Sequence, residues 1–139
     1  MIIKRFSVFL AVLLLSLSAL TAGNKPLSLR SSNPENGETG VPKDIVLELE
    51  FSNNVINLSV QENNRAALSL KVDNGELVGI EVVFPDDQLE PEKKRQISIR
   101  PLNPLKGGTT YSLQVDGTFR AKNGSNLGDP LTLSFTTVR

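Results

Sequence analysis

The sequence has no cysteine, no histidine and no tryptophan, and it has a single tyrosine. Without cysteine there is no disulfide and no thiolate nucleophile, and without histidine the commonest general base and zinc or copper ligand are missing. Charge of one sign is also lacking, because 15 Lys and Arg balance 15 Asp and Glu in 139 residues. These absences exclude most familiar catalytic and metal chemistry, and the balanced charge disfavours nucleic acid as a partner.

The first 23 residues have the layout of a secretory signal peptide. Lys4 and Arg5 precede an apolar run over residues 6–20, and small residues follow up to Ala22 and Gly23. At about 1.5 Å per residue the run reaches about 23 Å, which is short of the roughly 30 Å hydrocarbon core of a bilayer. We therefore expect cleavage after Ala22 or Gly23 and no stable membrane insertion afterwards.

The domain that remains, residues 24–139, is mildly acidic. It keeps 13 basic and 15 acidic residues, because the leader carries Lys4 and Arg5 but no acid. Small exported domains of eukaryotes tend to be rich in disulfides, so an exported domain without cysteine favours a bacterial envelope. We expect the protein to be secreted, periplasmic or exposed at the cell surface.

Alternation of apolar and polar residues dominates this domain. Ile45, Leu47, Leu49 and Phe51 fall on one side of a strand, and polar residues fall on the other. The same period of two recurs in further segments, namely 56–60, 68–72, 78–84, 97–99, 111–115 and 131–135. A weaker segment, Lys25–Ser31, adds an eighth strand.

Helical spacing is missing from the same region. No stretch longer than about ten residues has apolar residues repeating at intervals of three and four positions, so helices should be absent or limited to single turns. Glycine and proline fall between the alternating runs. The pattern predicts an all-β fold, a two-sheet sandwich of seven to eight strands with its core between the sheets.

The segment Asp73-Asn74-Gly75 separates two of these strands and is a hairpin signal. A two-residue loop here would place Glu81 on the buried face. A three-residue loop over 74–76 instead pairs apolar residues, such as Leu70 with Ile80. We therefore predict the three-residue loop, with Gly75 or Glu76 in a left-handed conformation and a bulge.

Five short motifs follow one another along the domain. In order they read NPENGETGVP, LEFS, PLKGGTTY, NGSNL and LSFTT, and they occupy residues 33–42, 49–52, 104–111, 123–127 and 133–137. In this order and spacing they resemble the bacterial Ig-like domains of the S-layer SbsA type over residues 28–137. The resemblance implies an immunoglobulin-like sandwich of the kind found as a module in surface proteins. Ser125 departs from the family, which more often has adjacent Gly and Asn in that loop.

Tyr111 follows Leu105 across a Gly-Gly loop. We interpret it as a tyrosine corner, in which the hydroxyl bonds back to the upstream loop and fixes the start of the strand. The alternative is a catalytic phenol or an aromatic contact.

Four carboxylates lie close together in Asp86, Asp87, Glu90 and Glu92, and the basic run 93–95 follows them. The spacing lacks the pattern of an EF-hand and its central glycine. We interpret the stretch as a solvated, mutually neutralising loop, with calcium binding as the alternative.

No reactive constellation emerges elsewhere. Periplasmic copper carriers, another exported Ig-like family with a related lead-in, rely on His and Met ligands, and here the only methionine is Met1. Neither a Gly-x-Ser-x-Gly nor a Ser-x-x-Lys arrangement occurs. We therefore predict no catalytic residues, no metal ligands and no cofactor.

The remaining hypothesis is an exported, non-catalytic Ig-like module for binding or structural assembly. Its partner would be an envelope or surface protein, or a polysaccharide, met by the loops at the sandwich ends or by a sheet edge. The candidate loops are Asn33–Lys43, Asp86–Lys94 and Lys122–Asp129, and Leu131–Val138 is a candidate edge strand. Alternatives are a carbohydrate or cell-wall binder, disfavoured because only Phe119 falls outside the core pattern, and an enzyme inhibitor.

Overall fold

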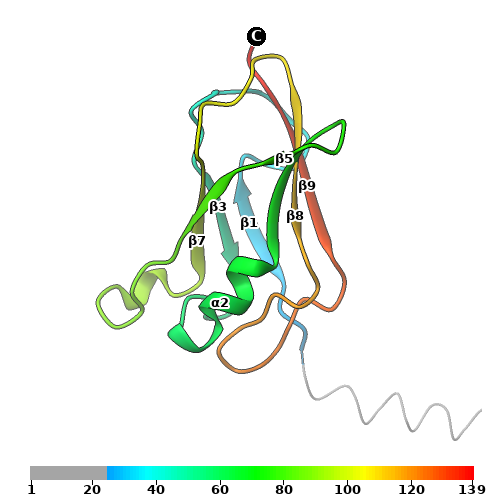
Figure 1. Ribbon diagram of the computed structural model, residues 1–139. Helices are drawn as coiled ribbons and strands as arrows, with labels where there is room; N and C mark the ends of the chain where they lie inside the picture. The colour runs from blue at the N-terminus through cyan, green and yellow to red at the C-terminus, as the bar shows by residue number, and fades with distance from the viewer. Residues whose placement is uncertain (1–24) are drawn as a thin grey trace, which may run out of the picture.

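Two facing β-sheets make up the part of the chain that the computed structural model describes, residues 25–139 (Figure 1). One sheet has four strands in the order β1-β3-β7-β6, and the other has five in the order β2-β9-β8-β4-β5. The strands are β1 Leu29–Asn33, β2 Glu38–Val41, β3 Leu47–Phe51, β4 Leu68–Val72, β5 Leu77–Val78, β6 Ile80–Val83, β7 Gln96–Pro101, β8 Thr110–Val115 and β9 Leu131–Thr137. The predicted all-β sandwich is confirmed. The predicted leader, residues 1–23, lies outside the described residues.

The core lies between the sheets, where the alternating apolar residues meet. Leu47, Leu49 and Phe51 are at most 2% exposed, and the polar residues between them face outwards. Two aromatic pairs stack within the core, Phe51 on Phe119 at 4.6 Å between ring centroids and Tyr111 on Phe135 at 5.7 Å. The expectation that Phe119 falls outside the core is wrong, because this ring is fully buried.

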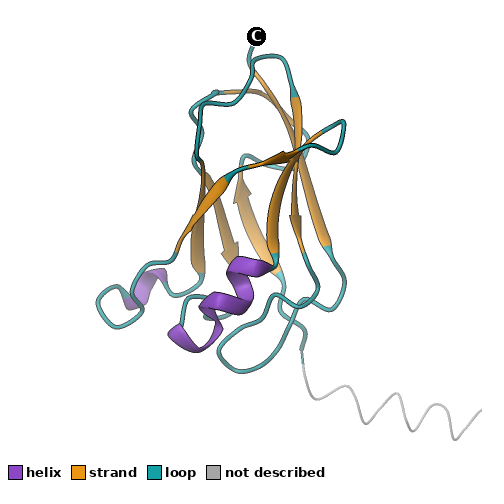
Figure 2. Cartoon of the chain, in the orientation of Figure 1, coloured by secondary structure: helices purple, strands orange, loops and turns teal. Residues whose placement is uncertain are grey.

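A helix replaces one of the predicted strands. The alternation predicts an extended segment over 56–60 and no helix longer than a single turn, but α2 spans the nine residues Leu58–Ala66, so both predictions are wrong (Figure 2). Asn57 begins it as an N-cap, and its side-chain oxygen accepts the Ser59 N–H at 3.1 Å. The buried face of α2 consists of Val60 and Asn64, four residues apart. Because one of these two is polar, the helix has no apolar repeat to read from sequence. A single 3₁₀ turn, η1, covers Pro91–Lys93.

The predicted strand 78–84 is divided between the two sheets at Gly79. β5 pairs with β4, and β6 pairs with β7 in the opposite sheet. A Cβ at Gly79 would lie 3.0 Å from Leu102 Cδ1, so the crossing passes close under Leu102. The crossing explains why Ile80 is not available to pair with β4.

The hairpin before this crossing has a three-residue loop, as predicted, but the loop is shifted by one residue. Val72 donates its N–H to the Glu76 carbonyl, so the loop is 73–75, and Leu70 lies opposite Val78 rather than Ile80. Gly75 has φ +91°, which confirms its left-handed conformation. The Asn74 side chain accepts the Glu76 N–H at 3.0 Å. This bond stabilises a turn that is centred on Asn74.

The sheet edges also differ from expectation. β9 lies between β2 and β8, so the prediction that Leu131–Val138 is an edge is wrong. β2, which falls inside the predicted loop 33–43, runs parallel to β9 with Val41 opposite Thr137. The weak first strand exists as β1 and pairs with β3. Among the described residues, no helix is long and apolar enough to cross a membrane.

Candidate functional site

Three connections and α2 meet at the end of the sandwich opposite the C-terminus (Figure 1). These are residues 52–57, 84–95 and 116–130, and with α2 they are here named the loop end. Two of the candidate loops, Asp86–Lys94 and Lys122–Asp129, belong to it. The third, Asn33–Lys43, lies at the other end, where Leu105 N–H donates to the Lys43 carbonyl at 2.8 Å. The structure therefore brings together two of the three predicted loops.

A fully buried asparagine connects α2 to two of these connections. Asn64 is 0% exposed. Its Nδ2 donates to the carbonyls of Val55 at 3.0 Å and Arg120 at 2.8 Å. Its Oδ1 accepts the Arg120 N–H and the Asn63 amide, both at 2.9 Å. Every hydrogen-bonding position of the side chain is occupied, so α2 is fixed to the chain on both sides of it.

A second cluster connects the remaining segment. Asn54 Oδ1 accepts the N–H groups of Ile56 and Asn57. The Nδ2 groups of Asn54 and Asn57 donate to Asp87 Oδ2 at 3.1 and 3.0 Å. These bonds, first from Asn57 and then from Asn54, lower the pKa of Asp87, and the charge of Lys122 acts in the same direction. The Asp87 carboxylate therefore joins 84–95 to 52–57 as an ionised acceptor.

Two other acids of this stretch, Asp86 and Glu90, make contacts within the loop itself. Asp86 Oδ1 accepts the Gln88 N–H at 2.8 Å, which forms an Asx turn. Glu90 pairs with Lys93 at 3.0 Å, and this pairing raises the pKa of Lys93. Across residues 25–139, no group of three or more His, Cys, Asp or Glu side chains converges as a metal site would require. The contacts are those of a neutralised loop.

Two exposed leucines lie in the segments that these hydrogen bonds connect. Leu58 is 79% exposed and Leu89 is 80% exposed. Leu58 follows Asn57 in the chain, Leu89 lies two residues after Asp87, and Asn57 and Asp87 are hydrogen-bonded to each other. The leucines thus project from segments that are joined together. Sequence reasoning misses both, because the alternation places Leu58 in a strand and Leu89 has no periodic neighbours.

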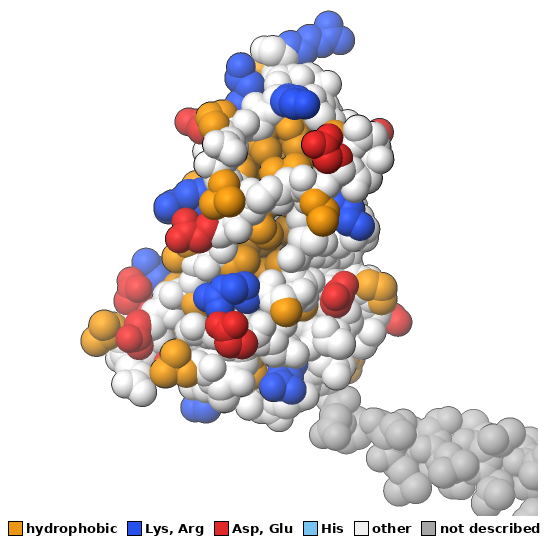
Figure 3. Space-filling model, in the orientation of Figure 1, with side chains coloured by type: hydrophobic (Ala, Val, Ile, Leu, Met, Phe, Trp, Pro, Cys, Tyr) orange, Lys and Arg blue, Asp and Glu red, His pale blue; other side chains and the backbone are white. Residues whose placement is uncertain are grey.

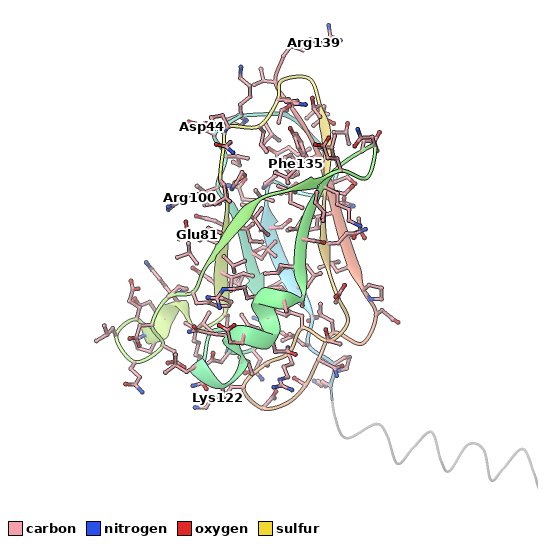
Figure 4. The ribbon with its side chains drawn as sticks, viewed as in Figure 1. Asp44, Glu81, Arg100, Lys122, Phe135 and Arg139 are labelled. Atoms are coloured by element: carbon pink, nitrogen blue, oxygen red, sulfur yellow. The ribbon has the colours of Figure 1, made fainter. Side chains whose placement is uncertain are left out.

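An apolar hollow continues from α2 along the face shown in Figure 3, between the two sheets. Leu68, Ile80, Val82 and Leu102 line it. At its rim Arg65 lies over the Phe84 ring, 5.1 Å from the centroid, which ties α2 to the start of 84–95. Glu81 and Arg100 lie near one another beside the hollow, 3.7 Å apart (Figure 4).

The opposite end is held by Tyr111. Its hydroxyl accepts the Lys106 N–H at 2.8 Å, and its ring is 2% exposed. Beside it, Thr137 Oγ1 accepts the Thr109 N–H at 3.1 Å. This is the geometry of a tyrosine corner.

Several solved structures share this fold at low sequence identity. CopC from Methylosinus trichosporium OB3b superposes with a TM-score of 0.54 at 16% identity, over 81% of this chain and 93% of that one. The S-layer protein SbsC, domains 1–6, superposes with a TM-score of 0.57 at 14% identity, over 87% of this chain and 15% of that one. L,D-transpeptidase 3 from Mycobacterium tuberculosis superposes with a TM-score of 0.52 at 14% identity, over 80% of this chain and 37% of that one.

The chain spans nearly all of CopC but less than half of the other two proteins. No protein of curated function matches the chain in sequence. The family model described as the bacterial Ig-like domain matches residues 23–137. The chain belongs to the family of bacterial Ig-like domains.

Proposed function

We propose that this protein is an exported, non-catalytic Ig-like module that acts in binding or structural assembly at the bacterial cell envelope or surface. The observation that carries the proposal is the loop end, where side-chain amides fix several segments and leave Leu58 and Leu89 exposed. The similar folds of an S-layer protein and of L,D-transpeptidases support an envelope setting. The order of the five motifs supports the SbsA type within the family, and the leader-like residues 1–23 support export.

The chemistry of the loop end supports binding over catalysis. Its best-connected ionisable group, Asp87, accepts two amide bonds, and its pKa is lowered, so it is poorly suited to donate a proton near neutral pH. The polar groups of Asn54, Asn57 and Asn64 are engaged with the protein itself. This arrangement stabilises a surface rather than activating a nucleophile.

The partner that fits this surface is a protein with an apolar contact patch. Burial of a leucine side chain contributes about 1.5 to 3 kcal/mol, and a preformed surface loses little conformational entropy on binding. The ring-stacking mode of carbohydrate recognition has less support, because Phe119 is buried and Phe84 lies under Arg65.

The test is crosslinking in the native host, with a tag at the C-terminus. That terminus lies at the end opposite the loop end (Figure 1), so the tag leaves the surface free. We expect one recurrent envelope protein to be captured by the wild-type chain, and to be lost from a Leu58→Ser, Leu89→Ser variant.

The matched control is Leu77→Ser with Val138→Ser. These residues are 68% and 44% exposed and lie outside the loop end. Capture should persist in this control. Equal loss in both variants, or no specific protein captured by the wild type, would contradict the proposal, and a captured hydrolase with suppressed activity would favour the inhibitor alternative.

A further inference from the structure

A second surface feature of the loop end is a polar groove beside the start of β1. One wall is the segment 25–30, the other is the turn 123–126, and Ser52 and Asn53 form the back. The groove has a volume of about 900 Å³. None of its lining residues is acidic. It lies apart from Leu58 and Leu89, which do not line it.

The walls of the groove are fixed to one another by hydrogen bonds from backbone N–H groups. Leu27 N–H donates to the Asn126 carbonyl at 2.9 Å. Ser28 N–H donates to Ser52 Oγ at 3.0 Å, and Ser52 N–H donates back to the Ser28 carbonyl at 2.9 Å. The groove is therefore formed before any ligand binds, which lowers the entropic cost of binding.

The turn that forms the second wall is also internally held. Asn123 Oδ1 accepts the Ser125 N–H at 3.0 Å and the Ser125 hydroxyl at 2.7 Å, and Gly124 has φ +89°. A Cβ at Gly124 would meet nothing within 4 Å, so this backbone is open to an approaching ligand. The inserted Ser125, where the sequence departs from its family, thus closes an Asx turn on the groove.

The charge of the groove comes from Lys25 and Arg30. Neither takes part in an ion pair within residues 25–139, and the segment before Lys25 contains no Asp or Glu. Around these cations stand hydroxyls and amides, namely Ser28, Ser52, Ser125, Asn53, Asn123 and Asn126. Two cations that line one groove among neutral donors and acceptors suit a ligand with an anionic group on a polyhydroxylated body.

We propose that this groove binds an anionic glycan, whose carboxylate or phosphate group meets Lys25 and Arg30 while its hydroxyls meet the Ser and Asn side chains. Recognition by charge and hydrogen bonds requires no aromatic platform, which this surface lacks. The inference rests on the proposed envelope function for its setting, but its site and its test are independent of the protein partner of Leu58 and Leu89.

The test measures binding of the secreted chain to defined polymers. The probes are polygalacturonate, which carries carboxylates, poly(glycerol phosphate), which carries phosphates, and neutral dextran. We expect retention by one or both anionic polymers, no retention by dextran, and weakening with added salt. The stronger of the two anionic probes identifies the anionic group.

The decisive variant is Lys25→Gln with Arg30→Gln, which should weaken binding about tenfold or more, since two charge-assisted contacts are lost. Its matched control, Lys43→Gln with Lys106→Gln, removes two exposed cations at the other end of the sandwich and should stay within about twofold of the wild type. Both variants should keep the wild-type melting temperature, and mass measurement should show the same mature N-terminus.

Several results would overturn the inference. They are no binding to either anionic polymer, equal weakening in the two variants, or equally tight binding of poly-glutamate or oligothymidylate. The last result would show attraction to any polyanion rather than recognition of a glycan. Failure here would leave the crosslinking test of Leu58 and Leu89 unaffected, so the two proposals fail separately.

Discussion

The two ends of the sandwich are closed in different ways. At the C-terminal end, Tyr111 makes one bond to Lys106 N–H from within a short turn, and its ring stacks on Phe135. At the loop end, the longer segments are held by amide side chains, with Asn64 at the centre. The tyrosine corner can be recognised from a short sequence motif, whereas the hydrogen-bonded asparagines have no such motif. The loop end, which carries the proposed binding surface, is therefore the harder of the two ends to predict from sequence.

The largest expected effect tests the loop end. Asn64→Ala leaves the Val55 carbonyl and both backbone groups of Arg120 without their partner, and we expect it to lower the free energy of unfolding by about 3 to 5 kcal/mol. Urea denaturation measures the change. Glu62→Ala, on the exposed side of α2, is the control and should stay within about 0.5 kcal/mol. A small effect of Asn64→Ala would show that water replaces its bonds and that the loop end is not clamped.

The next effect tests the opposite end. Tyr111→Phe keeps the stacked ring but leaves the Lys106 N–H without its acceptor, so we expect a loss of about 1 to 3 kcal/mol. An unchanged melting temperature would argue against the clamp. Combined with Asn64→Ala, the two losses should add within about 0.5 kcal/mol if the ends are independent. A larger coupling would mean that the sheets transmit strain between them.

A smaller, pH-dependent effect is expected from Asp87. Its pKa lies below the ordinary value of 3.8 in the folded chain, since the amides of Asn57 and Asn54 stabilise the carboxylate. Its contribution to stability is therefore present above the unfolded pKa and is lost as the pH falls through the lowered folded value. Melting curves from about pH 6 to about pH 2 should show a steeper acid loss for the wild type than for Asp87→Asn. Asp129→Asn is the control, and parallel acid profiles for wild type and Asp87→Asn would refute the assignment.

The smallest expected effect is that of calcium. Because Asp86, Asp87 and Glu90 engage Gln88, the two asparagines and Lys93 respectively, we expect millimolar calcium to leave the melting temperature unchanged. A calcium-dependent rise, absent in magnesium, would instead support the calcium alternative for the acidic stretch.

Sequence reasoning succeeded where alternation and burial coincide. The strands around Leu49, Ile97 and Leu113 follow directly from a period of two, and all three residues are buried. It failed where a polar residue occupies a buried position, as Asn64 does in α2, since the apolar pattern that would reveal the helix is then broken. It also failed at Gly79, because alternation continues through the crossing and carries no information about which sheet a strand joins.

The candidate site was predictable only in outline. Turn residues identified Asp86–Lys94 and Lys122–Asp129 as loops, but nothing local indicates that Asn54 and Asn57 reach Asp87 across about 30 positions of chain. The edge position of β2 was likewise hidden, because its parallel pairing with β9 depends on residues nearly a hundred positions away. Contacts between residues so far apart in the sequence are determined by the tertiary packing of the domain and not by a local sequence pattern.

The parallel pairing of β2 with β9 has a mechanical consequence. The described chain starts at the loop end and finishes at the opposite end, so tension applied through its two termini pulls β2 and β9 in opposite directions along their length (Figure 1). The bonds between them, among them Gly37 N–H to the Ser134 carbonyl and Val138 N–H to the Val41 carbonyl, are then loaded together in shear and do not open one at a time. Because β1 lies between the N-terminus and β2 and pairs with β3, a module anchored at both ends would load the β1–β3 pairs first and the β2–β9 pairs after them.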